Sequence, residues 1–169
     1  MKMYYLSKKD TRSLQDELKR VFRLQREFEK ILFVDASDHF KNKSVNIYIS
    51  LDDQKIPLVI KIDNDLIPAI HSLNKDILKI PYVKVDKGAV PRILNGADVM
   101  APGIIELSEF NAGDVVGVKE PENSLYIAVG KSLMSSTEIT TQKRGKAIKN
   151  LHYAGDSIWM ILLELLKKI

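Results

Sequence analysis

The stretch from Val85 to Gly103 constrains the fold most, because three glycines and two prolines interrupt its short apolar runs. The apolar run that leads into it, residues 82–85, is typical of a strand. Asp86 is a suitable N-cap, and apolar residues at helical spacing predict a short helix over residues 87–94. Pro91 limits that helix, because proline has no backbone N–H and fits comfortably only in the first turn.

This helix is predicted to end at Asn95-Gly96, since glycine tolerates the left-handed conformation that closes many helices. Residues 99–101 then return as a strand, and Pro102-Gly103 turns the chain again. Because the glycines carry no side chain, they leave backbone N–H groups open at the surface. The stretch therefore predicts a place where the backbone can approach a phosphate or a base closely.

Two modules are expected, residues 1–81 and residues 82–169. In the first, Ser7 is a plausible N-cap, and a helical stripe follows at Leu14, Leu18, Val21 and Phe22. Alternating apolar runs predict strands at 3–6, 31–34, 44–51 and 55–62, with a hairpin at 52–54. Residues 66–73 are expected to form a short helix, with Pro68 in its first turn.

The second module is punctuated by glycine and proline, which is typical of a small barrel of short strands. Strands are expected at residues 115–118, 125–129 and 147–153, with turns at 113–114 and 121–123. A helical turn is expected at 135–139. Residues 158–169 have helical periodicity, and Lys167 and Lys168 in the last turn suit the helix dipole.

Several ordered motifs of the second module resemble those of the PUA domain, a small RNA-binding pseudo-barrel. They are VDKGA, then IxxGADVMxPG, FNAGDVVGV, YIAVGKSLMSS and finally GKAIKNLHYAGDSIW. The ending is most similar to two-module proteins related to the malignant T-cell-amplified sequence family, including ligatin-type translation factors. The resemblance implies an α+β fold, with an N-terminal pre-PUA α/β module, a PUA pseudo-β-barrel and a C-terminal helix.

The resemblance also implies where RNA would lie, across the helix after VDKGA and the neighbouring glycine turn, reaching the last barrel strand. Lysines and arginines of this set would bind phosphates, its Gly and Ala residues would admit the RNA backbone, and Met100 would seat an unstacked base. Alternatively, the glycines and alanines only shape the turn, and Met100 belongs to the core. The implied RNA-binding residues are Lys87, Gly88, Ala89, Arg92, Gly96, Ala97, Met100, Pro102, Gly103, Arg144, Gly145, Lys146, Ala147 and His152.

A basic strip supports this side of the barrel independently of the resemblance. Residues 131–150 contain five cations, Lys131, Lys143, Arg144, Lys146 and Lys149, against the single acid Glu138. That excess equals the formal net charge of the whole chain, +4. Such a strip fits contacts with a nucleic-acid backbone, although a solvated surface would have the same composition.

The sequence gives little support for a nucleotide site, a metal site or a catalytic site. Gly130-Lys131-Ser132 shares its letters with a phosphate-binding loop, but Leu125 stands where the first glycine should be. The histidines His39, His71 and His152 have no ligand spacing, so no metal is expected. His152 lies between apolar neighbours, which favours a packed or hydrogen-bonded histidine over a catalyst. No nucleophile motif occurs. We therefore expect neither an enzyme nor a cofactor.

The chain has no cysteine, no secretory signal and no apolar run of membrane-spanning length, so a cytoplasmic, non-membrane protein is expected. The favoured function is binding of tRNA or ribosomal RNA in translation initiation or recycling, with the ribosome or a translation factor as partner. The alternatives are an RNA-targeting subunit for a modifying enzyme on a separate chain and a protein-interaction adaptor.

The C-terminal helix leaves two further alternatives, because apolar residues cover more than half of its circumference. Trp159, Leu162, Leu163 and Leu166 lie on one face, and Ile158, Ile161, Leu165 and Ile169 lie on an adjoining face. Either both faces are buried between the modules, or one face docks a partner protein or a second copy of the chain.

Overall fold

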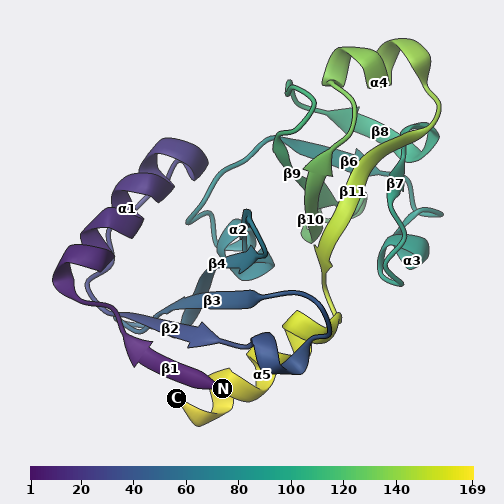
Figure 1. The fold of residues 1–169 in the computed structure, drawn as a ribbon. Helices are drawn as coiled ribbons and strands as arrows, with labels where there is room; N and C mark the ends of the chain where they lie inside the picture. The colour runs from purple at the N-terminus through teal and green to yellow at the C-terminus, as the bar shows by residue number, and fades with distance from the viewer. The chain divides into compact units, whose positions relative to one another are not determined.

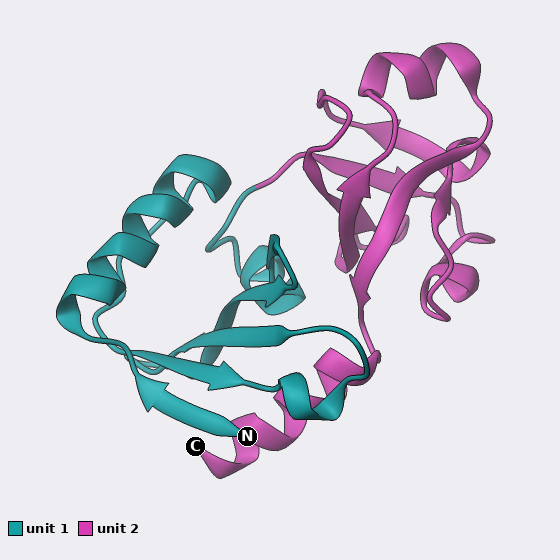
Figure 2. Cartoon of the chain, viewed as in Figure 1, with its two compact units in different colours: residues 1–79 teal, residues 80–169 magenta.

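In the computed structural model, which describes residues 1–169, the chain divides into two units, residues 1–79 and residues 80–169 (Figure 2). The sequence placed this boundary between residues 81 and 82. The PUA-like motifs therefore all lie in the second unit.

The first unit is built on an antiparallel sheet with the strand order β1-β2-β3-β4-β5 (Figure 1). Each strand pairs with the next one in the chain, so short turns and one helical crossing suffice to connect them. The strands are β1 (Lys2–Tyr5), β2 (Ile31–Asp35), β3 (Val45–Ser50), β4 (Ile56–Ile62) and β5 (Asp65–Pro68), and a 3-10 helix η1 (Ser37–His39) follows β2.

Helix α1 (Lys8–Phe22) begins where the sequence predicts, because the Ser7 hydroxyl accepts a hydrogen bond from Asp10 N at 3.1 Å. Its buried stripe is Thr11, Leu14, Leu18 and Phe22. Val21 was predicted to belong to this stripe, but it is exposed. Val21 immediately precedes Phe22 and therefore lies on a neighbouring side of the helix. The core is filled by the narrower row of Leu14, Leu18 and Phe22, spaced four residues apart.

The predicted helix over residues 66–73 is wrong in its first half. Residues 65–68 form strand β5, which pairs with β4, and helix α2 (Ile70–Asn74) starts only after Ala69. Pro68 closes the strand instead of opening the helix. A proline is tolerated here because β5 is an edge strand with only one neighbour in the sheet.

The second unit forms a six-stranded sheet that curls into a nearly closed pseudo-barrel, with the order β7-β11-β10-β9-β6-β8 (Figure 1). Only β6 and β9 run parallel; the other neighbours are antiparallel. The predicted fold class is confirmed. The strands are β6 (Tyr82–Val85), β7 (Val99–Met100), β8 (Ile104–Leu107), β9 (Val115–Lys119), β10 (Tyr126–Ser132) and β11 (Lys146–Tyr153).

Short helices connect the strands of this sheet. Helix α3 (Val90–Ile93) and the 3-10 helix η2 (Ala101–Gly103) flank β7, and α4 (Ser136–Gln142) joins β10 to β11. In α4, Ser135 and Glu138 form a reciprocal capping box, which extends the predicted turn by three residues. The barrel core is a single buried cluster that includes Val83, Val85, Ile93, Val99, Val116, Val118 and Ile148.

The C-terminal helix α5 (Ser157–Lys168) buries Ile158, Leu162 and Leu165, while Met160 and Leu163 are exposed. The buried row therefore takes members from both predicted faces. None of the helices in the chain is long and apolar enough to cross a bilayer.

Candidate nucleic-acid interface

A cavity of about 730 Å³ opens in the second unit, between helix α3, strand β7, η2 and the start of β11. Its walls come from residues far apart in the sequence, because β7 pairs with β11 and brings Met100 opposite Lys146. The lining residues are Asp86, Ala89, Arg92, Ile93, Gly96, Ala97, Asp98, Val99, Met100, Pro102, Gly103 and Lys146.

Helix α3 is much shorter than the predicted helix over residues 87–94, since only residues 90–93 are helical. Asp86 acts as a cap, as predicted, but for a turn: its Oδ1 accepts a hydrogen bond from Ala89 N at 2.9 Å. That turn uses up residues 86–89, and Pro91 then stands in the first turn of the helix. The shortening leaves Lys87 and Gly88 exposed beside the cavity rather than on a helix.

The glycine turn after α3 has the conformation predicted from the sequence. Gly96 has a φ of +94°, and its N–H donates to Ile93 O at 3.0 Å. Ala97 N donates to Arg92 O at 3.0 Å, so the turn closes the short helix. A side chain added at Gly96 would meet the ring of Tyr153, with Cε1 at 3.4 Å.

Replacing Gly96 with alanine should therefore lower the free energy of unfolding by about 1–2 kcal/mol for the left-handed backbone, and by more for the contact with Tyr153. Gly113→Ala is the matched control, because Gly113 has a φ of +91° and nothing within 4 Å of an added Cβ. Urea denaturation of both variants measures the difference. Equal losses would mean that the Tyr153 ring moves aside freely.

Asn150 on β11 holds the cavity wall together, and the sequence did not single it out. Its Nδ2 donates to Ile93 O and to Ala97 O, both at 3.1 Å, and its backbone N–H donates to Asp98 Oδ1 at 2.9 Å. One residue, through its side chain and its backbone N–H, thus ties the end of α3, the glycine turn and Asp98 to the last barrel strand. The asparagine within the KNLHY segment was the available signal, but nothing local links it to residues 93–98.

Most of the RNA-binding residues expected from the sequence lie together. Ala89, Arg92, Gly96, Ala97, Met100, Pro102, Gly103 and Lys146 line the cavity. Arg144 and Gly145 are exposed immediately before β11, and Gly145 O accepts from Ala101 N at 2.9 Å. Met100 is 44% exposed, which favours the alternative in which it contacts a ligand over a place in the core.

Ala147 and His152 are corrections to the expected set, because neither side chain has exposed surface. Ala147 is part of the buried barrel cluster. His152 Nδ1 lies 2.8 Å from Asp156 Oδ2, as expected for a hydrogen-bonded barrel histidine. We therefore remove both residues from the candidate interface.

The charges around the cavity are mixed. Lys146 Nζ lies 3.6 Å from Asp98 Oδ2, and Lys87 Nζ lies 3.9 Å from Glu122 Oε1 in a highly exposed pair. Exposed pairs of this kind contribute little to stability and open readily for a ligand. Arg92 and Arg144 have no ion-pair partner.

The basic strip continues along the neighbouring strands. Lys131 on β10 stands directly opposite Lys149 on β11, and both are exposed. Lys143, at the end of α4, is also exposed, so all five cations of the strip reach the surface.

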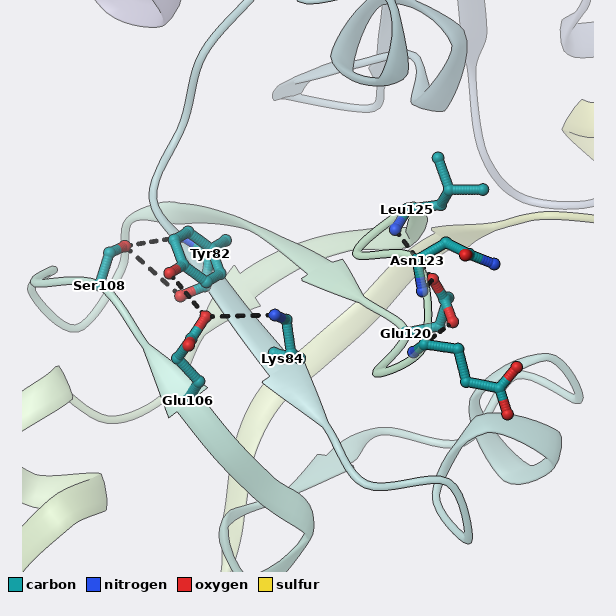
Figure 3. A network of polar contacts seen from close by, with 8 residues as sticks. Tyr82, Lys84, Glu106, Ser108, Glu120, Asn123 and Leu125 are labelled. Atoms are coloured by element: carbon teal, nitrogen blue, oxygen red, sulfur yellow. Dashed lines mark hydrogen bonds and ion pairs between the residues drawn. The ribbon is translucent and has the colours of Figure 1, made fainter.

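A second polar cluster lies on β6 and β8 and at the β9–β10 turn of the same unit, and Figure 3 shows its contacts. Tyr82 Oη donates to Glu106 Oε2 at 2.8 Å, and Lys84 Nζ lies 3.5 Å from the same oxygen. The hydrogen bond to Glu106 raises the pKa of Tyr82, and the same bond with the charge of Lys84 lowers the pKa of Glu106.

Nearby, Glu120 accepts hydrogen bonds from the N–H groups of Glu122, Asn123 and Leu125, which closes the predicted turn after β9 (Figure 3). Lys119 Nζ lies 4.1 Å from the centre of the Tyr82 ring. These groups satisfy one another, so the cluster fastens strands and a hairpin rather than presenting open donors to a ligand.

The phosphate-loop resemblance at residues 130–132 does not correspond to a loop. Gly130, Lys131 and Ser132 lie in strand β10, which runs three residues beyond the predicted strand over residues 125–129. The structure contains no group of three or more His, Cys, Asp or Glu side chains placed to hold a metal ion.

Residues 81–154 match the PUA domain. An uncharacterized protein of Methanocaldococcus jannaschii is 37% identical over 166 residues, covering 94% of this chain and 95% of that protein. The solved structure of a conserved PUA domain protein from Thermoplasma acidophilum superposes with a TM-score of 0.77 at 29% identity. The superposition covers 95% of this chain and 99% of the Thermoplasma acidophilum chain.

Two eukaryotic relatives match over a shorter range. Translation machinery-associated protein 20 of Saccharomyces cerevisiae is 29% identical over 91 residues, 50% of each chain. Malignant T-cell-amplified sequence 1-A of Xenopus laevis is 33% identical over 84 residues, 47% of this chain and 46% of that protein. Here the match spans about half the length of the relatives.

Proposed function

Because this chain belongs to the PUA-domain family, we propose that it is a non-enzymatic RNA-binding protein of the translation machinery, cytoplasmic and directed to tRNA or to ribosome-bound RNA. The name of the yeast relative supports the link to translation. The first unit is proposed to be a pre-PUA module, and the second the RNA-binding module.

One observation carries the proposal. The residues that the resemblance assigns to RNA come from two distant segments, and the fold gathers most of them around one cavity with a basic strip beside it. Arg92 and Lys146 line that cavity, and Arg144 lies next to Lys146 at its rim. Cations at the edge suit phosphates, and the small residues Ala89, Gly96 and Ala97 let a base and its sugar approach the backbone.

Neutralising Arg144 and Lys146 together by glutamine should weaken tRNA binding and reduce the slope of log affinity against log salt by about 1–2 units. When binding makes fewer phosphate contacts, it releases fewer counter-ions from the RNA. The affinity and its salt dependence therefore fall together. Filter binding of bulk tRNA at several salt concentrations measures both quantities.

The matched control is Lys8→Gln with Lys9→Gln, which removes two exposed cations from the first turn of α1. It changes the net charge by the same amount and should leave the slope nearly unchanged. If both double variants lower the slope equally, binding depends on net charge and the strip is not an interface.

Affinity purification from cells separates this function from its rivals. Ribosomal subunits or tRNA that co-purify in an RNase-sensitive manner would support a role in translation. A stoichiometric RNA-modifying enzyme in their place would indicate a targeting subunit. Protein partners that remain after RNase treatment, with no RNA, would indicate an adaptor.

Self-association through α5, whose exposed apolar residues are Met160 and Leu163, is tested in the same preparation by light scattering.

A further inference from the structure

Asp98 is a carboxylate in the wall of a cavity whose proposed ligand is a polyanion. Its side chain is 28% exposed, so a ligand can reach it. A carboxylate at this position repels phosphate groups, and therefore does not serve the RNA backbone. Neither the sequence motifs nor the electrostatics of the basic strip give it a role.

One oxygen of this carboxylate is anchored, and the other is less constrained. Its Oδ1 accepts the hydrogen bond from Asn150 N at 2.9 Å, and Asn150 is itself tied to Ile93 O and Ala97 O. Its Oδ2 lies 3.6 Å from Lys146 Nζ, which is 65% exposed and so only loosely held. An acceptor that is anchored to a strand and has one less constrained oxygen is arranged to take a hydrogen bond from a ligand.

The exposed apolar surface beside Asp98 suits the face of a base. Met100 and Pro102 are exposed on the cavity wall, and its volume of about 730 Å³ lies within the range of pockets that hold small organic groups. A base seated there would present its hydrogen-bonding edge to polar groups of the wall. Asp98 supplies an acceptor in that wall.

On the basis of the proposed RNA-binding function, we propose that Asp98 reads the exocyclic amino group of one unstacked base, and that the cavity thereby rejects uracil. The N4 amino group of cytosine donates to a carboxylate, which is a common pairing in nucleic-acid recognition. Uracil has the O4 carbonyl at the same place, and two acceptors would face each other.

The competing explanation is that Asp98 only partners Lys146. In that case its charge opposes every RNA equally, and removing the charge raises the affinity for all bases by the same factor. The two explanations therefore differ in the ratio of affinities for different bases, not in the affinity for any one RNA.

The test uses Asp98→Asn in the full chain, with ribocytidine and ribouridine oligomers of equal length as probes. The amide oxygen of asparagine can keep the hydrogen bond from Asn150 N, so the wall is preserved while Oδ2 becomes an N–H₂ donor. Wild type should bind the cytidine oligomer about tenfold more tightly than the uridine oligomer. Asp98→Asn should abolish or reverse this ratio, because a donor now faces the base.

Asp114→Asn is the control, since Asp114 accepts from Asn111 N outside the cavity and its loss changes the net charge equally. It should leave the ratio at its wild-type value. A ratio that is the same in wild type and Asp98→Asn overturns the role of Asp98 alone. Failure of wild type to bind either oligomer or tRNA overturns the proposed function as well.

Discussion

Gly130→Ala should lower the free energy of unfolding of the second unit by at least about 3 kcal/mol, which makes it one of the two most damaging single changes expected here. Gly130 lies in the middle of β10, where the pairing with β11 shifts register between Val129 and Gly130. A Cβ there would overlap the carbonyl oxygen of Lys149 and lie 2.7 Å from Ile148 Cγ2. A backbone oxygen inside a strand pair cannot move away without breaking the ladder.

Gly88→Ala is the control for this change. An added Cβ at Gly88 meets only Asp86 Oδ1, at 3.6 Å, and its φ is not in the left-handed region. Its stability should stay within about 0.5 kcal/mol of wild type. Thermal unfolding followed by the fluorescence of the single tryptophan, Trp159, reports on the second unit. If Gly130→Ala has the same melting temperature as Gly88→Ala, the register shift between β10 and β11 adjusts to the added methyl group.

Gly130 also illustrates why the sequence predicts the strands of the barrel better than their contacts. The glycine is part of a motif with an obvious local interpretation, a phosphate-binding loop, and the strand predicted over residues 125–129 stops just before it, whereas β10 continues through it. The close approach of Lys149 O depends on a register shift between two strands, which no local pattern records. The same holds for Gly117, where an added side chain would overlap the Tyr126 ring.

Elements with strong local signals were predicted closely. The Ser7 cap fixed the start of α1, and the alternating runs fixed β3 and β4 to within a residue or two. The errors fall where a tertiary contact decides between local alternatives. Pro68 is as suitable for the first turn of a helix as for an edge strand. Pairing of residues 65–68 with β4 selects the strand. Asp86 accepts from Ala89 N the bond that a helix cap accepts, yet only residues 90–93 become helical, and the sequence does not show this difference.

The candidate interface was predictable to the extent that the resemblance carried it. Glycines, alanines and cations on both segments were placed by motif, and the fold brings most of them to one cavity. Asp98 and Asn150 were missed because their roles arise across β7 and β11, more than fifty residues apart in the chain. Ala147 and His152 were included because a motif does not say which of its residues become buried, and both are fully buried.

The interior of the barrel gives His152 a structural role, together with Asp156. Asp156 Oδ1 accepts from Trp159 N at 2.8 Å and so caps α5, while Oδ2 accepts from Tyr153 N at 3.0 Å and from His152 Nδ1. His152 Nε2 is buried without a partner, and Nδ1 donates to Asp156 Oδ2. Three elements of structure, the end of β11, the following turn and α5, thus depend on one carboxylate.

Asp156→Ala should therefore lower the free energy of unfolding by about 3–5 kcal/mol, since it removes a helix cap and leaves the buried His152 imidazole without its partner. Ser135→Ala is the matched control, because Ser135 caps α4 at an exposed position and its loss should cost only about 1 kcal/mol. Urea denaturation compares the two. Losses of similar size would show that the contacts with His152 and Tyr153 add nothing to the cap.

The pH dependence gives an independent readout of the same carboxylate. Burial by itself would raise the pKa of Asp156, but the hydrogen bond and charge of His152 and the N–H groups of Trp159 and Tyr153 hold that pKa below its ordinary value. A carboxyl whose pKa is lower in the folded state stabilises the fold above its unfolded pKa, and this stabilisation is lost as pH falls through the folded pKa. Wild type should therefore lose stability below about pH 4, and Asp156→Ala should lose less over the same interval. Parallel acid titrations of the two proteins would contradict this assignment.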